Sequence, residues 1–151
     1  MNPRILLFVA TVILSACASE TPSTSAAPAV APSPATSDPS GASPWDAARA
    51  RGIGFRGIGN EPGWLVEVGA DETPALHAEL DYGERKVDVA RMQPLSGILG
   101  YAGMTTEGVE VKLHLRREDC SDGMSDNTYP VSARLIVGDK TYAGCGRFPQ
   151  E

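Results

Sequence analysis

Strict alternation of apolar and polar side chains over residues 109–116, VEVKLHLR, constrains the fold more than any other feature. Successive side chains of a β-strand point to opposite faces, so this pattern gives one apolar face and one polar face. Strands with one wet face are typical of antiparallel sheets. The same period of two recurs in four other stretches, at residues 64–68, 76–82, 86–89 and 131–137. The alternation therefore predicts an all-β fold.

Turn signals rich in Gly, Pro and Asp separate these stretches, and we expect about eight short strands between Phe55 and Tyr142. Residues 45–151 offer enough chain for one modest core. Eight strands with one apolar face can close into a small antiparallel barrel, which removes the sheet edges. A two-sheet β-sandwich is the alternative. The sequence thus favours one small β-barrel domain.

A short helix is predicted just before the first strand. Ser43 is suited to the N-cap, Pro44 to the first helical position, and Asp46 to the positive end of the helix dipole. Gly52 can adopt the left-handed conformation that ends many helices. The barrel is therefore expected to carry one N-terminal helix.

Residues 1–16 have the pattern of an export signal. Arg4 precedes an apolar run of ten residues at 5–14, which is shorter than the roughly 20 residues that cross a bilayer. The stretch LSAC, ending at Cys17, resembles the lipobox of bacterial lipoproteins. The resemblance implies cleavage before Cys17, lipidation of its thiol and, with Ala18 next, sorting to the outer membrane facing the periplasm. An ordinary secretory signal with an incidental cysteine is the alternative.

Residues 17–44 are expected to form a disordered tether. Ala, Ser, Thr and Pro make up 23 of the 27 residues after Cys17. Such a segment buries too little apolar area to offset the entropy of ordering it. A proline-rich ligand for a partner is the alternative, but the segment has no P-x-x-P with a basic flank. We therefore predict a domain held to a membrane by its lipid, with an envelope protein as its possible partner.

Composition and spacing argue against several other functions. Beyond residue 44 the chain has 17 acidic and 12 basic side chains, which argues against nucleic acid as a partner. His77 and His114 are far apart, on the polar faces of predicted strands, and no H-x-x-H or C-x-x-C spacing indicates zinc. There is no G-x-S-x-G elbow for a nucleophile and no G-x-G-x-x-G for a nucleotide. We predict no metal, no cofactor and no catalytic residues.

Cys120 and Cys145 remain as an even pair once Cys17 is assigned to lipid. In an exported chain the compartment oxidises thiols, so a disulfide is the expected state. By the chain-entropy estimate it would stabilise the domain by about 3 to 4 kcal/mol. A reactive thiol at Cys120 is the alternative.

The stretch DCSDGMSDNTYP, residues 119–130, raises a second question because it is rich in acids. An EF-hand places calcium ligands at positions 1, 3, 5 and onward to a Glu at 12. The Asp and Asn residues at 119, 122, 126 and 127 do not follow that spacing. Short polar side chains also cap turns, so we expect turn capping here, with calcium binding as the alternative.

Two motifs together resemble a family of bacterial envelope lipoproteins. FRGIGNEPGWLVEV (residues 55–68) carries G-N-E-P-G-W, and CSDGMSDNTYPVSARL (residues 120–135), followed by GCGR (residues 144–147), carries C-x-D-x-M-S-x-x-x-Y-P. The resemblance covers nearly all of the predicted domain. It implies a small β-rich periplasmic domain with a Cys–Cys bridge and brings no activity with it.

Five residues are candidates for a binding surface: Asn60, Glu61, Trp64, Ser96 and Tyr101. The first three belong to the G-N-E-P-G-W motif. There we expect a type II turn with Pro and Gly at its centre and a tryptophan that plugs one end of the barrel. A capped hairpin turn without a ligand is the alternative for Asn60 and Glu61.

The stretch LSGILGY, residues 95–101, loosely resembles the inhibitory loop of small barrel lipoproteins that inhibit lysozyme. Ile98 and Leu99 stand where a basic residue would be expected. Three functions are thus open: a non-enzymatic binding or envelope-maintenance protein, an inhibitor of a lysozyme-like hydrolase, and a carrier of a small apolar ligand inside the barrel.

Overall fold

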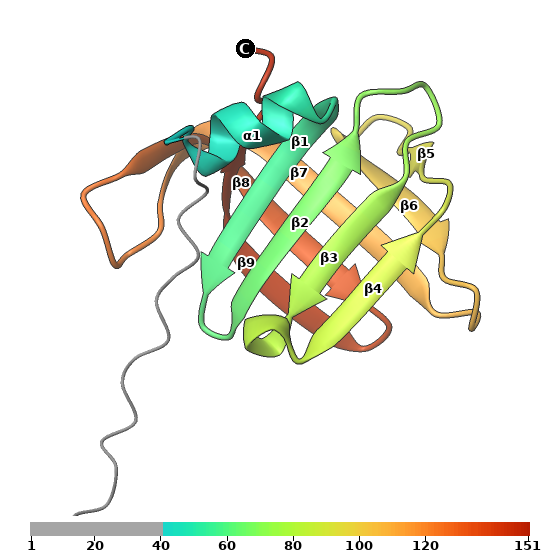
Figure 1. Ribbon diagram of the computed structural model, residues 1–151. Coiled ribbons are helices and arrows are strands. Elements are labelled where there is room, and N and C mark those ends of the chain that lie inside the picture. The colour runs from blue at the N-terminus through green and yellow to red at the C-terminus, as the bar shows by residue number, and fades with distance from the viewer. Residues whose placement is uncertain (1–40) are drawn as a thin grey trace, which may run out of the picture. The chain divides into compact units, whose positions relative to one another are not determined.

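The computed structural model describes residues 41–151, which form one short helix and a single antiparallel sheet of nine strands (Figure 1). The predicted signal, Cys17 and most of the predicted tether lie outside the described residues. The elements are α1 (Pro44–Ala50), β1 (Ile53–Asn60), β2 (Gly63–Gly69), β3 (Leu76–Leu80), η1 (Asp81–Gly83), β4 (Arg85–Val89), β5 (Gln93–Pro94), β6 (Gly100–Met104), β7 (Glu110–Ser121), β8 (Thr128–Val137) and β9 (Lys140–Arg147).

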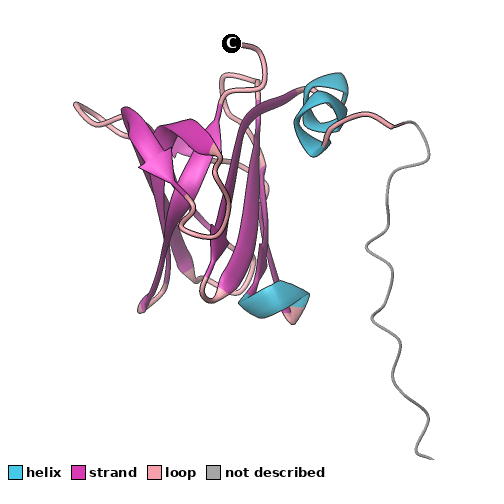
Figure 2. Ribbon diagram, turned by 90° about the vertical axis from the view of Figure 1, so that its left-hand side faces the viewer, coloured by secondary structure: helices cyan, strands magenta, loops and turns pink. Residues whose placement is uncertain are grey.

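The sheet has the strand order β4-β3-β2-β1-β9-β8-β7-β6-β5 and curls on itself. Strands β1 to β4 form the near wall in Figure 1, and β6 to β9 form the far wall behind them. Figure 2 shows the same two walls from the side, with α1 outside them. The all-β, barrel-like fold with a single short helix is therefore confirmed.

Full closure of the barrel is not reached, because β4 and β5 stand at the two ends of the strand order. β5 has only two residues, and its second residue, Pro94, lacks the N–H that a further ladder would need. The free edge of β4 presents exposed Lys86 and Asp88, and charged residues on edge strands discourage pairing with another chain. The domain is thus a half-barrel with two edges.

The core fills the space between the two walls. Along residues 109–116 the inward side chains Val111, Leu113 and Leu115 are buried, and the polar side chains between them face outward. Eighteen buried residues form one apolar cluster, with Phe55 and Tyr142 among the largest. Because these side chains occupy the interior, the structure gives no support to a carrier that holds its ligand inside the barrel.

Helix α1 is capped as the sequence predicts. Ser43 is the N-cap, and its Oγ accepts a hydrogen bond of 3.1 Å from the backbone N–H of Asp46. Pro44 opens the helix, and Gly52 follows its end with φ +75°. Capping of this kind stabilises a short helix by about 1 kcal/mol.

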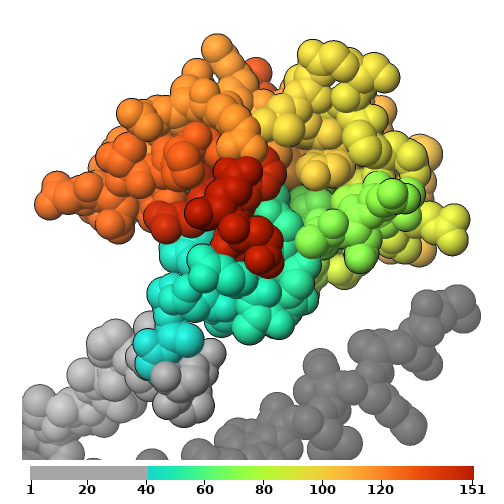
Figure 3. Space-filling model, turned by 90° about the horizontal axis from the view of Figure 1, so that it is seen from above, coloured from blue at the N-terminus to red at the C-terminus, as the bar shows by residue number. Residues whose placement is uncertain are grey.

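Side chains of α1 fasten it to the sheet. The Trp45 ring lies 4.7 Å from the Arg147 guanidinium and 5.6 Å from that of Arg56. Arg49 Nε donates a 2.5 Å hydrogen bond to the carbonyl of Pro149. In the view from above, the C-terminal residues, in red, lie beside the helix region, in blue-green (Figure 3). The helix therefore docks where the chain ends.

The turn between β1 and β2 corrects one prediction. Asn60 pairs with Gly63, so Glu61 and Pro62 form a two-residue loop, and the bond between them is cis. A cis-proline at the third position defines a type VI turn, and the expected type II turn is wrong. The turn begins one residue earlier than expected, because Gly63 belongs to β2 and pairs with Asn60. Gly63 also lies against the ring of Tyr82, since a Cβ at residue 63 would lie 2.6 Å from Tyr82 Cδ1.

Trp64 is the most closely enclosed side chain near this turn. It is 5 % exposed, and its Nε1–H donates a 3.1 Å hydrogen bond to the carbonyl of Ala143 in β9. The absence of side chains at Gly59 and Gly144 makes room for the ring. The indole thus joins the core and ties β2 to β9 across β1.

Replacing Gly59 with Ala should destabilise the domain by about 1 to 3 kcal/mol, the usual cost of overpacking. A Cβ at residue 59 would lie 2.0 Å from Trp64 Nε1 and 2.7 Å from the Ala143 carbonyl oxygen. Gly69→Ala is the matched control, since its nearest neighbour would be 3.6 Å away. Urea unfolding measures both variants, and equal midpoints would contradict the role given to Gly59.

Candidate binding groove

A groove with a volume of about 880 Å³ lies on the outer face of β1, β9, β8 and β7. The tip of the β7–β8 hairpin forms one side of the groove, and this hairpin projects from the body of the domain in orange in Figure 1. Residues from the β1–β2 turn and from the β5–β6 turn complete its lining. The groove therefore brings together segments that are far apart in the sequence.

The strand register sets the floor of the groove. One cross-strand row runs through Ile58, Cys145, Ser132 and Arg116. The next row runs through Ala143, Arg134 and His114. These residues alternate with the inward-facing core residues, so their side chains point outward. The small side chain of Ala143 leaves a depression beside the longer side chain of Arg134, whereas the Ser132 hydroxyl donates a 2.7 Å hydrogen bond to Glu118.

The rim of the groove carries two exposed apolar side chains. Met124, at the tip of the β7–β8 hairpin, is 74 % exposed, and Ile98, in the β5–β6 turn, is 55 % exposed. The β5–β6 turn is held at the floor because the carbonyl of Leu99 accepts a 2.9 Å hydrogen bond from the N–H of Leu115. Large apolar side chains left in water beside a groove are typical of binding surfaces.

Asp122 organises the hairpin tip. Its carboxylate accepts hydrogen bonds from the N–H groups of Met124 (3.1 Å) and Ser125 (2.9 Å) and from the hydroxyl of Ser125 (2.8 Å). The bonds from Ser125 are the main reason that the pKa of Asp122 lies below its ordinary value. Turn capping, as the sequence predicted, is thus the observed use of this acid. Within residues 41–151, no three or more His, Cys, Asp or Glu side chains lie close enough together to hold a metal ion.

Two cross-links fix the hairpin to the rest of the domain. Cys120 and Cys145 form the predicted disulfide, with their Cα atoms 5.6 Å apart. Asn60 Nδ2 donates a 2.9 Å hydrogen bond to the backbone carbonyl of Asp122. The G-N-E-P-G-W and C-x-D-x-M-S motifs therefore meet at the groove. Because the two thiols are bonded to each other, neither acts as a free nucleophile in this state.

The basic side chains on the floor of the groove have few polar partners. Arg134 and His114 face each other across the β7–β8 ladder. Within the described residues, neither side chain has a hydrogen bond or an ion pair. Arg116 lies 3.5 Å from Glu118, but both side chains are largely exposed, and surface pairs of this kind contribute little.

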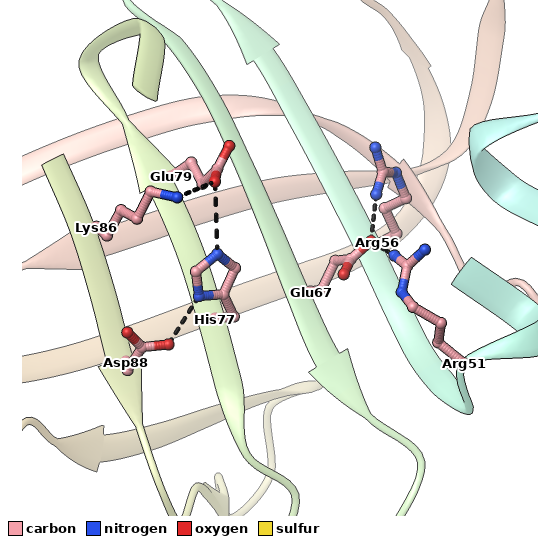
Figure 4. A network of polar contacts seen from close by, with 7 residues as sticks. All are labelled: Arg51, Arg56, Glu67, His77, Glu79, Lys86 and Asp88. Atoms are coloured by element: carbon pink, nitrogen blue, oxygen red, sulfur yellow. Dashed lines mark hydrogen bonds and ion pairs between the residues drawn. The ribbon is translucent and has the colours of Figure 1, made fainter. Parts of the chain in front are cut away.

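The outer face of the opposite wall has the contrary arrangement, which Figure 4 shows. There Glu67 pairs with Arg56 and, at 2.5 Å, with Arg51. Nearby, His77 Nδ1 lies 2.7 Å from Asp88, and Lys86 lies 3.0 Å from Glu79. The hydrogen bond from Lys86 is the main cause that lowers the pKa of Glu79. The charged side chains drawn in Figure 4 pair with one another, whereas Arg134 in the groove has no ion pair within the described residues and can bind a ligand.

The five candidate residues fall in different places. Asn60 and Glu61 line the groove, whereas Trp64 is buried beneath it. Ser96 is exposed in the β5–β6 turn, and Tyr101 packs against the core.

Sequence reasoning did not place Ile98, Met124 and Arg134 in the site. The one signal that could have found two of them is the presence of large apolar side chains in turn sequences, at 98 and 124. Arg134 gave no such signal, because an outward-facing arginine on a strand is ordinary.

Comparison of the chain with protein-family models, with curated proteins and with solved structures found no match in any of the three. In residues 41–151, none of the helices has the length and apolar character needed to span a membrane.

The capping role of Asp122 predicts how the hairpin responds to acid. A carboxyl whose pKa is lowered by folding stabilises the folded loop above its unfolded pKa of about 3.9, and this contribution is lost as pH falls through the lower folded value. Protection of the Met124 and Ser125 amides, which is the slowing of their exchange relative to that of an unfolded peptide at the same pH, should therefore fall below about pH 4 and be low at all pH values in Asp122→Ala. Asp126→Ala, in the same loop, is the control and should leave protection unchanged.

Proposed function

We propose that this protein is a lipid-anchored, non-enzymatic binding protein of the bacterial envelope, and that the groove holds its partner. The observation that carries the proposal is the combination of an arginine without an ion pair, Arg134, and its cross-strand neighbour His114 with exposed apolar side chains, Ile98 and Met124, around one hollow. Interfaces of proteins that bind proteins combine such groups, and methionine and arginine are enriched in them.

The construction of the groove supports binding. The disulfide, the Asn60 hydrogen bond and the Asp122 turn hold its walls before any partner arrives. A preformed surface lowers the entropy cost of association. Because core side chains fill the interior, the groove on the outer face is the hollow that a partner can reach.

The membrane anchor is supported by the sequence alone. The lipobox-like LSAC and the following run of Ala, Ser, Thr and Pro suit a lipidated Cys17 on a tether. A tether of this composition would let the groove search the space near the membrane surface.

Replacing Cys17 with Ser should release the protein from the membrane fraction or leave it as an uncleaved precursor. Two or more acyl chains make anchoring stable, and the variant has no site for them. Fractionation of envelope membranes with immunodetection measures the outcome. A cleaved Cys17→Ser protein that still sediments with membranes would contradict the anchor.

Photo-crosslinking in living cells tests the groove. A photoreactive amino acid at residue 98 or 124 should give the same discrete adduct with an envelope protein. The matched control is residue 104, because Met104 is 61 % exposed but does not line the groove. Adducts that are absent at 98 and 124, or equally strong at 104, would refute the groove as the binding surface.

A further inference from the structure

We infer that the partner presents a carboxylate next to an apolar side chain, on an extended protein segment that lies in the groove. The carboxylate binds Arg134 and His114. The apolar side chain fills the depression over Ala143, beside Met124 and Ile98. This inference rests on the proposed function, because it specifies the partner of the same groove.

Charge supports the first half of the inference. The domain is acidic overall, yet Arg134 and His114 meet in adjacent strands, and neither has an ion pair or hydrogen bond with an acid among residues 41–151. The guanidinium of arginine presents a planar fork of N–H donors that matches a carboxylate bidentately. Arg116, on the same side of the floor, adds to the positive potential because its pair with Glu118 is exposed.

Shape supports the second half. Next to Arg134 the floor drops to the small side chain of Ala143, whereas next to Arg116 the Ser132 hydroxyl is occupied by a 2.7 Å hydrogen bond to Glu118. Met124 and Ile98 stand on the rim with most of their apolar surface in water. A methionine side chain adapts to irregular apolar surfaces, so an apolar residue in the depression would bury surface on both sides.

Two other partner classes fit the groove poorly. Glu61, Glu118 and Asp122 also line it, so the groove can receive a single carboxylate at Arg134 but not the many negative charges of an anionic membrane surface. Single-stranded nucleic acids stack their bases on aromatic side chains, and no Phe, Tyr or Trp is among the described residues that line the groove. A protein segment with both a carboxylate and an apolar group uses all parts of the lining.

The test selects random peptides against the chain as its host produces it, purified in detergent and immobilised. One library displays peptides with a blocked C-terminus, so that only Asp and Glu supply carboxylates. The other library displays free C-termini. Enriched sequences should place Asp or Glu beside Leu, Ile, Met or Phe in the first library, or end on such an apolar residue in the second. The library that is enriched identifies the source of the carboxylate.

Affinity of an enriched peptide for variants then locates the contact. Arg134→Glu should weaken binding about tenfold or more, because the pairing charge is reversed. Arg134→Lys should bind with intermediate affinity, since it keeps the charge but loses the fork. Arg91→Glu is the matched control: Arg91 is exposed, lies outside the groove and has no ion pair within residues 41–151, so its variant should bind like the natural chain.

Three results would overturn the inference: no enrichment of carboxylates, enrichment of basic peptides, or equal losses of affinity in Arg134→Glu and Arg91→Glu. If photoadducts form at residues 98 and 124 under any of these results, the groove still binds a partner and only the partner's chemistry is wrong. If the photoadducts are absent too, the proposed function fails with it.

Discussion

Apolar contact between two walls holds this sheet in its curled shape, because no ladder of hydrogen bonds joins the edge strands β4 and β5. The two walls are in close contact at Gly103 of β6, where a Cβ would lie 2.7 Å from both Val89 Cγ1 and Met92 Sδ. Full burial of one aliphatic side chain contributes about 1.5 to 3 kcal/mol. Packing among the eighteen residues of the core cluster therefore holds the two walls together, as hydrogen bonds between the first and last strands do in a complete barrel.

The groove depends on the same packing. Its floor is the outer face of β7, β8 and β9, and their inner faces carry core residues such as Leu115 and Ala133. The register that sends Leu115 inward sends His114 and Arg116 outward. A slip of one residue would exchange the two sets, so the burial of the core also specifies which charged side chains line the groove.

Local patterns were sufficient to predict much of the fold. Alternation located the main strands, the capping residues located α1, and the even cysteine pair gave the disulfide. The turn at Glu61 and Pro62 was mispredicted, because a proline–glycine pair favours the centre of a type II turn, whereas Gly63 pairs with Asn60 and leaves Glu61 and Pro62 as the loop. The sequence predicted a closed barrel, whereas the sheet stays open between β4 and β5. The alternation of apolar and polar residues in β4 does not reveal that β5 ends after two residues.

The site was harder to predict than the fold, for a physical reason. Arg134 and Ala143 are neighbours only through the β8–β9 ladder, and Asn60 reaches Asp122 only because the hairpin tip bends back toward β1. Neither relation is periodic in sequence. Asn60 and Glu61 were found because they belong to a recognisable motif, whereas Ile98 and Met124 became meaningful only once their exposure beside the same hollow was known.

The docking of α1 has a mechanical consequence. If the chain is anchored at its N-terminal side and a partner is bound over β7 to β9, any tension between the two must cross the seam between β1 and β9. That ladder pairs only Arg56, Gly57 and Ile58 with three residues of β9. Four further contacts span the seam or its ends: Trp45 on Arg147, Arg49 with Pro149, Trp64 with Ala143, and Asn60 with Asp122. The β1–β9 ladder is short, but these four contacts reinforce it. Tension on the tether would therefore be distributed over the ladder and the four contacts before β1 separated from β9.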